Sequence, residues 1–478
     1  MLIALLIYFA VLLIVARLSG KGGNDAFFRA GRKSPWALVA FGMIGASISG
    51  VTFIGVPGWV MTTDMTYIQM CLGFIVGYII VAFVLLPLYY KLGLTSIYTY
   101  LQYRLGNTSY KTGAWFFILS KLLGAAAKFY VVVQILQVCV ADQYGIPYAV
   151  TAIITLLFIW IYTRRSGIRT LVWTDVLQTF ILLLALIIIL VQVCAKLEFS
   201  FTDAWTAVWN DPHAKVFEFS DWTSKQHFWK QFLSGVFVVI VMTGLDQDMM
   251  QKNLTCKNLR AAQKDMCSYG VMFVPVNLLF LALGILLLML YSQIGMEIPE
   301  KGDSLLANIV LSGTLGQTAM ICFGIGVVAS AFSSADSSMT AITTSMCIDI
   351  LQKEHDERLR KRVHLLVMIA FLLCSLAFNA IGSGSVMDLI YTLVSYTYGP
   401  LLGLFAFSMW SARRSDHILT PYVAIASPVI CYIIDYTTLK FTGYKFGYEM
   451  LLLNGLLTFI GLWAIRCGKS YPSPPQKI

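Results

Sequence analysis

Residues 45–58 read Gly-Ala-Ser-Ile-Ser-Gly-Val-Thr-Phe-Ile-Gly-Val-Pro-Gly, and they lie in the middle of a long apolar stretch at 35–60. Glycines, β-branched residues and hydroxyls weaken a helix, and a segment that is unwound at mid-membrane depth frees backbone carbonyls that can bind a cation. The same small residues could instead form a packing face for a neighbouring helix. The stretch therefore predicts either a broken membrane helix at an ion site or a tight helix–helix contact.

The composition indicates a membrane protein. Of the 478 residues, 58% are hydrophobic and only 12% are charged, about half the charged share of a soluble domain. A membrane helix needs roughly 20 apolar residues. Thirteen runs meet this need, at about 2–18, 35–60, 67–91, 113–141, 146–163, 170–194, 230–250, 267–294, 317–349, 363–382, 385–411, 419–437 and 446–466. The sequence thus predicts an all-α polytopic membrane protein.

The positive residues support this count of spans. With the N-terminus outside, the cytoplasmic loops hold 24 of the 34 Lys and Arg residues and the outer loops hold 7, as the positive-inside rule requires. We expect a multi-pass protein of the cell (inner or plasma) membrane with a cytoplasmic C-terminus. The net charge of +10 then faces anionic lipid rather than nucleic acid. Short interfacial helices are expected in the outer segments 195–229 and 296–312.

Several function classes are excluded by what the sequence lacks. It has no C-x-x-C pair, its five histidines lie in loops or at span ends, and no P-loop motif is present. We therefore expect no enzyme, no haem or transition-metal centre and no ATP-driven pump, so any transport draws on an ion gradient. A transmembrane sensor would need an attached signalling domain, and the chain ends about 12 residues after its last span. A passive channel remains an alternative.

The ninth span carries a dense polar segment, Ser333-Ser-Ala-Asp-Ser-Ser-Met-Thr340. The spacing i, i+3, i+4 places Ser334, Ser337 and Ser338 on one helix face. Hydroxyl and carbonyl oxygens are hard donors that suit Na⁺. The alternative is that the serines bond back to their own helix.

Three charged residues lie within other spans. Asp175, near the inner end of the sixth span, could pair with an arginine such as Arg169 or bind an ion. Lys121 could reach water at the membrane surface by extending its long side chain. Lys128 is too deep for this, so it either neutralises an acid such as Asp435 or contacts an anionic substrate.

The chain resembles the sodium:solute symporter family over nearly its full length. The matching stretches are Ile48-Ser-Gly-Val-Thr-Phe-Ile-Gly-Val-Pro57, Leu171-Val-Trp-Thr-Asp-Val-Leu-Gln178, Gly244-Leu-Asp-Gln-Asp-Met-Met-Gln-Lys252 and Gly399-Pro-Leu-Leu-Gly403. The resemblance implies a LeuT-type fold of two inverted five-helix repeats, each beginning with a broken helix. The second break is expected around Met242–Gly244.

The implied organisation has five parts. They are an N-terminal helix and loop (1–34), the first repeat (35–194), an outer loop (195–229), the second repeat (230–411), and two C-terminal helices with a tail (412–478).

The resemblance also implies the ion sites. The family's principal sodium site would take carbonyls from Gly45, Ile48 and Ser334 and hydroxyls from Ser337 and Ser338. Some members bind a second sodium, which would here use Asp175, Ser337 and Thr340. The next position of that two-sodium pattern is a serine, whereas this chain has Ala341.

For the solute, the second and third spans are most similar to the sialic-acid branch. The implied substrate positions are Ser49, Thr52, Tyr67, Cys71 and Met242, with Lys128 where that branch has a carboxylate-binding arginine. Val239 and Met242 differ from the residues of the sugar branch and count against a neutral hexose.

The function that the resemblance implies is Na⁺-coupled import of a small polar solute, such as an anionic sugar acid, by alternating access. A neutral sugar, an amino acid or another nutrient is the alternative. The expected partners are the solute, Na⁺ and the lipid bilayer, with no nucleic acid and no obligate protein partner.

Overall fold

The computed structural model describes residues 2–19, 23–164, 167–381, 386–411, 413–415 and 418–469, and this part of the chain is mostly helical. The helices of the first half are α1 (Leu2–Ser19), α2 (Asn24–Arg29), η1 (Ala30–Arg32), α3 (Trp36–Ser47), α4 (Gly50–Thr63), α5 (Tyr67–Ile80), η2 (Val81–Leu85), α6 (Leu86–Leu92), α7 (Thr99–Arg104), α8 (Asn107–Leu136), η3 (Gln137–Ala141), η4 (Asp142–Tyr144), α9 (Tyr148–Thr163), α10 (Ile168–Lys196), α11 (Phe201–Asn210) and η5 (Pro212–Ala214).

The second half continues in the same way. Its elements are α12 (Phe228–Val239), η6 (Ile240–Gly244), α13 (Gln247–Asn253), α14 (Leu259–Ile294), η7 (Gly302–Ser304), α15 (Leu305–Leu311), α16 (Gly316–Ser345), η8 (Met346–Ile350), α17 (Glu357–Ile381), α18 (Val386–Thr397), α19 (Gly399–Trp410), β1 (Arg413–Arg414), α20 (Thr420–Thr442), α21 (Glu449–Ala464) and β2 (Cys467–Lys469). The two strands pair antiparallel.

Two helices are broken rather than continuous. α3 and α4 meet at an angle of 63°, and the continuous pair α12–η6 meets α13 at 70°. The first break lies at Ile48 and Ser49, and the second at Leu245 and Asp246. Both breaks predicted from the sequence are therefore confirmed, the second one or two residues beyond the predicted position.

The predicted spans agree with the helices. Among the described residues, eight helices are long and apolar enough to cross a membrane, or ten if each bent pair is one span. The remaining predicted runs, at 146–163, 385–411 and 446–466, contain α9, the pair α18 and α19, and α21. Thirteen, as the number of crossings, stays a prediction. The short helices expected in the outer segments are confirmed as α11 and α15.

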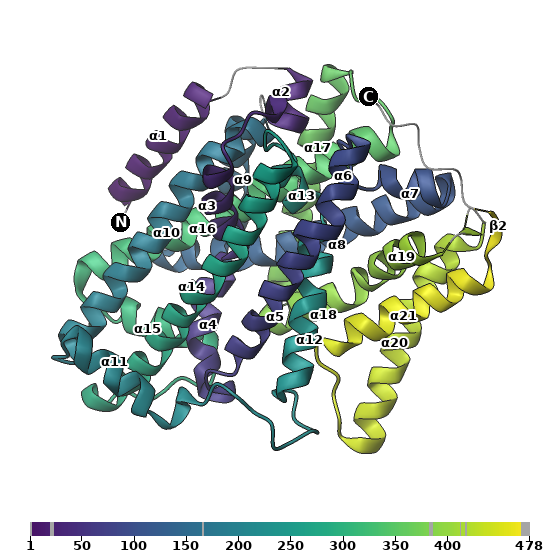
Figure 1. Ribbon diagram of the computed structural model, residues 1–478. Coiled ribbons are helices and arrows are strands. Elements are labelled where there is room, and N and C mark those ends of the chain that lie inside the picture. Colours follow the sequence, from purple (N-terminus) through teal and green to yellow (C-terminus); the bar gives the residue numbers. More distant parts are fainter. Residues whose placement is uncertain are drawn as a thin grey trace.

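The serine-rich helix α16 lies in the middle of the bundle (Figure 1). It packs against α3, α8, α10 and α13, and every residue from Gly326 to Ser345, the last two thirds of the helix, is buried. In Figure 1, α11 and α15 lie toward one end of the long helices, and α2, α6 and α7 lie toward the other. The fold thus places both breaks and α16 in the interior, where a polar site is shielded from lipid.

Candidate functional site between the broken helices

The first break removes the ordinary helical donors of two backbone carbonyls. Ile48 has φ −80° and ψ 88°, and Ser49 is extended. The Ser49 N–H donates to the Ser47 carbonyl rather than to that of Gly45. The Thr52 N–H donates to the Ser49 hydroxyl, at 3.4 Å, rather than to the Ile48 carbonyl. The carbonyls of Gly45 and Ile48 are thereby left able to bind another group, as the sequence predicts.

Close packing holds this break in place. A Cβ at Gly45 would lie 2.1 Å from the Thr179 hydroxyl oxygen of α10, and one at Gly50 would lie 3.2 Å from the Ser330 hydroxyl oxygen of α16. Only glycine allows such approaches, because any side chain would push the helices apart. The sequence left open an ion site or a packing face, and the structure shows that this segment has both a break and a packing face.

The three predicted serines of α16 are buried together with the acid between them. Ser337 and Ser338 are 1% and 2% exposed. The Ser338 hydroxyl donates to the Ser334 carbonyl at 2.7 Å and approaches Asp248 at 3.4 Å. The Ser337 hydroxyl donates to Asp336 at 3.3 Å. Back-bonding therefore accounts for Ser338 but not for Ser337, whose oxygen faces a carboxylate.

The chemistry of this oxygen set fits a small alkali cation. It combines carbonyls at the α3 break with hydroxyls on the adjoining α16, all of them hard oxygen donors. In the described ranges, no group of three or more His, Cys, Asp and Glu residues is arranged to hold a transition metal. The carbonyl and hydroxyl oxygens themselves suit Na⁺.

The second break carries an acidic pair that the sequence interpretation assigned no role. Asp246 caps α13 by accepting the Asp248 N–H at 2.8 Å. Lys121 of α8 lies 3.0 Å from an Asp246 oxygen and 2.8 Å from an Asp248 oxygen. The Tyr398 hydroxyl also donates to Asp246, at 2.7 Å. The prediction that Lys121 reaches water is thus wrong, because its ammonium neutralises the acids of α13 instead.

Tyrosines bind the backbone carbonyls that the second break releases. The Tyr89 hydroxyl donates to the Gly244 carbonyl at 3.0 Å, and the Tyr98 hydroxyl donates to the Leu245 carbonyl at 2.8 Å. Unpaired buried carbonyls are costly, so these contacts stabilise the bent form. At this break the carbonyls are therefore occupied by protein donors.

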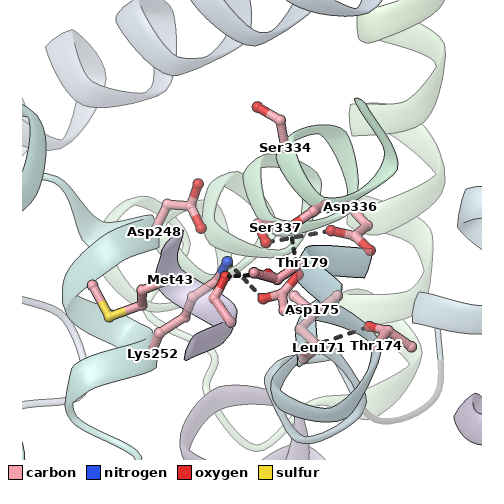
Figure 2. Close-up of polar contacts among 12 residues, drawn as sticks. Met43, Leu171, Thr174, Asp175, Thr179, Asp248, Lys252, Ser334, Asp336 and Ser337 are labelled. Carbon is pink, nitrogen blue, oxygen red and sulfur yellow. Dashed lines mark hydrogen bonds and ion pairs between the residues drawn. The ribbon is translucent and has the colours of Figure 1, made fainter. Parts of the chain in front are cut away.

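Asp175 and Lys252 form a buried ion pair (Figure 2). The Lys252 ammonium of α13 lies 2.8 Å from one Asp175 oxygen of α10, and the two side chains are 2% and 1% exposed. The other Asp175 oxygen accepts the Ser333 hydroxyl at 2.7 Å. Asp175 is therefore paired, as one of its two predicted roles required, but its partner is Lys252 and not Arg169. Lys252 lies just beyond the predicted span 230–250, where a cytoplasmic loop residue is expected, and the structure instead buries it.

A cavity lies between the two broken helices and α8. Five of the six predicted substrate residues line it, namely Ser49, Thr52, Tyr67, Lys128 and Met242. Its wall adds hydroxyls, aromatic rings and charged groups, among them Ser47, Phe74, Tyr78, Ser120, Lys121, Val239, Thr243, Asp246, Asp248, Tyr269, Phe273, Ser334, Ser338 and Tyr398. Because Ser334 and Ser338 also belong to the predicted sodium site, the ion site and the cavity share a wall.

Cys71 and Asp435 are not where the sequence analysis expected them. Cys71, one turn beyond Tyr67 on α5, is fully buried in the hydrophobic core and is not among the residues that line the cavity. Asp435 accepts the Phe446 N–H at 3.1 Å and the Tyr396 hydroxyl at 3.5 Å. It is thus no counter-ion of Lys128. Among the side chains that the structure describes, which do not include those of residues 386–391, no carboxylate lies within 4.0 Å of the Lys128 ammonium.

Sequence reasoning missed five charged or polar residues of the interior. They are Lys121 and Lys252 in their observed roles, and Asp246, Asp248 and Asp336. A signal was present, since Asp246, Asp248 and Lys252 fall within the quoted stretch 244–252. Their spacing in sequence did not show which lysine faces which acid.

Two broken helices around a buried cavity, with hard oxygen donors at one break, define a secondary active membrane transporter. The family model of the sodium:solute symporter family matches residues 27–417. The chain belongs to this family of sodium-coupled symporters, in which Na⁺ is the coupling ion.

The individual relatives have a low sequence identity to this chain but align with most of its length. The sodium/sialic acid symporter NanT of Aliivibrio fischeri is 24% identical over 91% of this chain and 87% of its own. The human sodium/iodide cotransporter is 24% identical over 82% of this chain and 62% of its own. Among solved structures, the substrate-bound outward-open state of a Na⁺-coupled sialic acid symporter matches with a TM-score of 0.80 and 20% identity, covering 98% of both chains. The fold is accordingly the LeuT-type fold that the resemblance implied.

Proposed function

We propose that this symporter imports a small organic anion, a sugar acid such as sialic acid, together with Na⁺ by alternating access. The single observation that carries the proposal is the environment of Lys128. Its ammonium lines the cavity without a carboxylate within 4.0 Å among the described residues. The other two lysines of this region, Lys121 and Lys252, are ion-paired. Lys128 is thus available to a carboxylate that arrives with the solute.

The remaining cavity wall suits a polyhydroxylated acid. Hydroxyls of Ser49, Thr52 and Thr243 can exchange hydrogen bonds with solute hydroxyls, and Tyr67 and Phe273 offer apolar faces. Two of the relatives, the sialic acid symporter and the iodide cotransporter, are named for solutes that are anions. A neutral sugar or amino acid is the second candidate, but Val239 and Met242 on the wall offer it no polar contact.

Sodium binding would be coupled to solute binding because Ser334 and Ser338 belong to the proposed sodium site and also line the cavity. We place the ion between the carbonyls of Gly45, Ile48 and Ser334 and the hydroxyls of Ser337 and Ser338. An ion there holds the α3–α4 break against α16, and Ser49 on the same break lines the cavity. Each ligand then favours the conformation that the other binds, and this coupling is reciprocal.

The proposed cycle moves the solute without chemical conversion, so no catalytic residue is assigned. In the proposed orientation the N-terminus is outside and the C-terminus is cytoplasmic, which the distribution of Lys and Arg in the loops supports. A tenfold inward sodium gradient supplies about 1.4 kcal/mol per ion. A membrane potential of 100 mV adds about 2.3 kcal/mol for each net charge moved.

Uptake into proteoliposomes tests the proposal. Radiolabelled sialic acid is offered with Na⁺ or with choline outside, and unlabelled sugar acids, neutral sugars and amino acids are added as competitors. We expect uptake only with Na⁺ and competition chiefly by acids. Equal uptake in choline would contradict coupling, and competition only by neutral solutes would contradict the anionic substrate. Currents far above carrier turnover would indicate a channel.

A further inference from the structure

We infer that the Lys252 ammonium occupies the place of a second sodium ion at Asp175, so that this symporter binds and moves one Na⁺ per cycle. The inference deepens the proposed function and rests on it for the transport ratio, though not for the number of ions bound. It concerns a residue to which the sequence assigned no role.

Both oxygens of Asp175 face groups of the protein. One lies 2.8 Å from the Lys252 ammonium, and the other accepts the Ser333 hydroxyl at 2.7 Å. Figure 2 shows the lysine of α13 extended toward the aspartate of α10, with Ser337 and Asp336 on the neighbouring helix α16. A sodium ion at this carboxylate would have to displace a lysine that is 2% exposed.

The neutral oxygens of a second ion site are nevertheless present. The Thr340 hydroxyl is completely buried and has no hydrogen-bond partner among the described residues. The Ser337 hydroxyl has only the long contact of 3.3 Å to Asp336. Buried polar groups are normally hydrogen-bonded, so an orphaned hydroxyl beside this cluster marks a place where an ion would have donors. The carboxylate that such an ion needs is the group that Lys252 neutralises.

Electrostatics favours the lysine over an added ion. Besides Asp175, the charges of Asp248 and Asp336 also act on the Lys252 ammonium. Removing it would leave the Asp175 carboxylate uncompensated in the interior, and adding sodium beside it would place two cations together. An ammonium on the chain fills the site permanently, whereas a sodium ion would leave with each cycle.

This permanence has a measurable consequence for coupling. A resident ammonium does not cross the membrane, so it draws no energy from the sodium gradient. One Na⁺ and one monovalent anion together carry no net charge. Import of a sugar acid should therefore be insensitive to the membrane potential, whereas a two-sodium carrier would move one net positive charge.

Sodium binding to the purified full-length chain tests the inference without any solute. Radioactive Na⁺ is titrated at constant ionic strength maintained with choline, and the bound ions are counted. We expect one ion per wild-type chain, and two ions would overturn the inference. In Lys252→Met the freed Asp175 should bind a second ion, and the double variant Lys252→Met/Asp175→Asn should return the count to one.

Lys252→Met could fail to fold, because it leaves the buried Asp175 carboxylate without its cation. If it fails to fold, the wild-type count decides the matter alone, since that value is one or two regardless of the variant. If it folds and still binds a single ion, Lys252 does not exclude a second one, and the inference is wrong.

Transport separates this inference from the proposed function. In proteoliposomes, a K⁺ diffusion potential set with valinomycin should leave sodium-driven uptake of sialic acid unchanged. A severalfold stimulation by an inside-negative potential would overturn the one-sodium ratio while leaving symport of an anion intact. Failure to transport acids would overturn the proposed substrate, and the number of bound sodium ions would still test Lys252.

Discussion

Lys121 and Lys128 lie two turns apart on the same face of α8, yet only Lys121 has carboxylate partners. Its ammonium contacts Asp246 and Asp248, at 3.0 and 2.8 Å, whereas Lys128 lines the cavity without one in the described part of the chain. The i, i+7 spacing gives both lysines the same direction, so the difference arises from what faces them. The break before α13 supplies acids at the level of Lys121 and none at the level of Lys128.

Replacing Lys128 by glutamine should weaken the binding of acidic solutes by about 10- to 100-fold, since a charge-assisted hydrogen bond contributes roughly 1.5–3 kcal/mol. Uptake of a neutral competitor, if any is transported, should change much less. The measurement is the KM for each solute in proteoliposomes. Lys128→Arg, which keeps the charge, is the matched control and should retain acid transport. An equal loss for acidic and neutral solutes would favour a structural role.

Replacing Ser337 and Ser338 together by alanine should raise the sodium concentration for half-maximal uptake by at least about tenfold, because two ion ligands of roughly 1 kcal/mol each are removed. The matched control is Ser330→Ala, a buried serine on the same helix whose hydroxyl donates to the Val327 carbonyl at 2.9 Å. Sodium titration of uptake is the measurement. An unchanged sodium dependence would remove both hydroxyls from the site.

Replacing Gly45 by alanine should abolish sodium-coupled uptake. The added Cβ would lie 2.1 Å from the Thr179 hydroxyl oxygen and 3.0 Å from the Thr179 Cα, so α3 must move away from α10. The predicted sodium ligands at the break would move with it. Gly124→Ala is the control for the sodium site: a Cβ there meets nothing within 4 Å, and although Gly124 lines the cavity, its sodium concentration for half-maximal uptake should not change. Normal uptake by the Gly45 variant would show that the break tolerates displacement.

Replacing Lys121 by methionine should lower stability by about 3 kcal/mol, the lower end of the cost of breaking a buried ion pair, because Lys121 retains 14% exposure. The substitution leaves Asp246 and Asp248 without the ammonium that they share. Thermal unfolding of the purified protein measures the change. Adding Asp248→Asn to this variant should recover part of the loss, and a further decrease would contradict the assigned pairing.

The segment 195–229 should loosen only in strong acid. A hydrogen bond from the Lys215 ammonium, with further ones from Ser220 and Asp221, lowers the pKa of Glu218 from 4.5 to about 2. A depressed carboxyl pKa stabilises the fold above pH 4.5, and this contribution is lost as the pH falls through about 2. Pepsin cleavage of the loop should therefore be slow at pH 4 and fast near pH 2. Glu218→Gln should weaken this dependence, and an unchanged profile would assign the transition to other acids.

Much of the fold could be predicted from the sequence, because membrane spans depend on local apolar length and on loop charge. The break at Ile48 was also predictable, since glycine and hydroxyl residues act on the helix in which they lie. The break at Leu245 was harder to place, because η6 continues α12 through Gly244 and the carbonyls it frees are bound by tyrosines distant in sequence.

The candidate site was predictable where a single helix defines it. The serine face of α16 follows from helical periodicity, and five of the six predicted substrate residues do line one cavity. The exception, Cys71, differs from Tyr67 by one turn of the same helix. Both side chains are buried, and which of them borders the cavity depends on how α5 packs against its neighbours, which sequence spacing does not specify.

The sequence by itself thus determined that this is a helical membrane symporter with a sodium-binding chemistry, because composition, periodicity and motif are properties of segments. Only the tertiary structure decided the partners of the charges. It joined Lys252 to Asp175 and Lys121 to Asp246 and Asp248, and it left Lys128 facing the cavity. The physical reason is that charge pairing in a low-dielectric interior depends on distances between different helices, and these distances exist only once the bundle is packed.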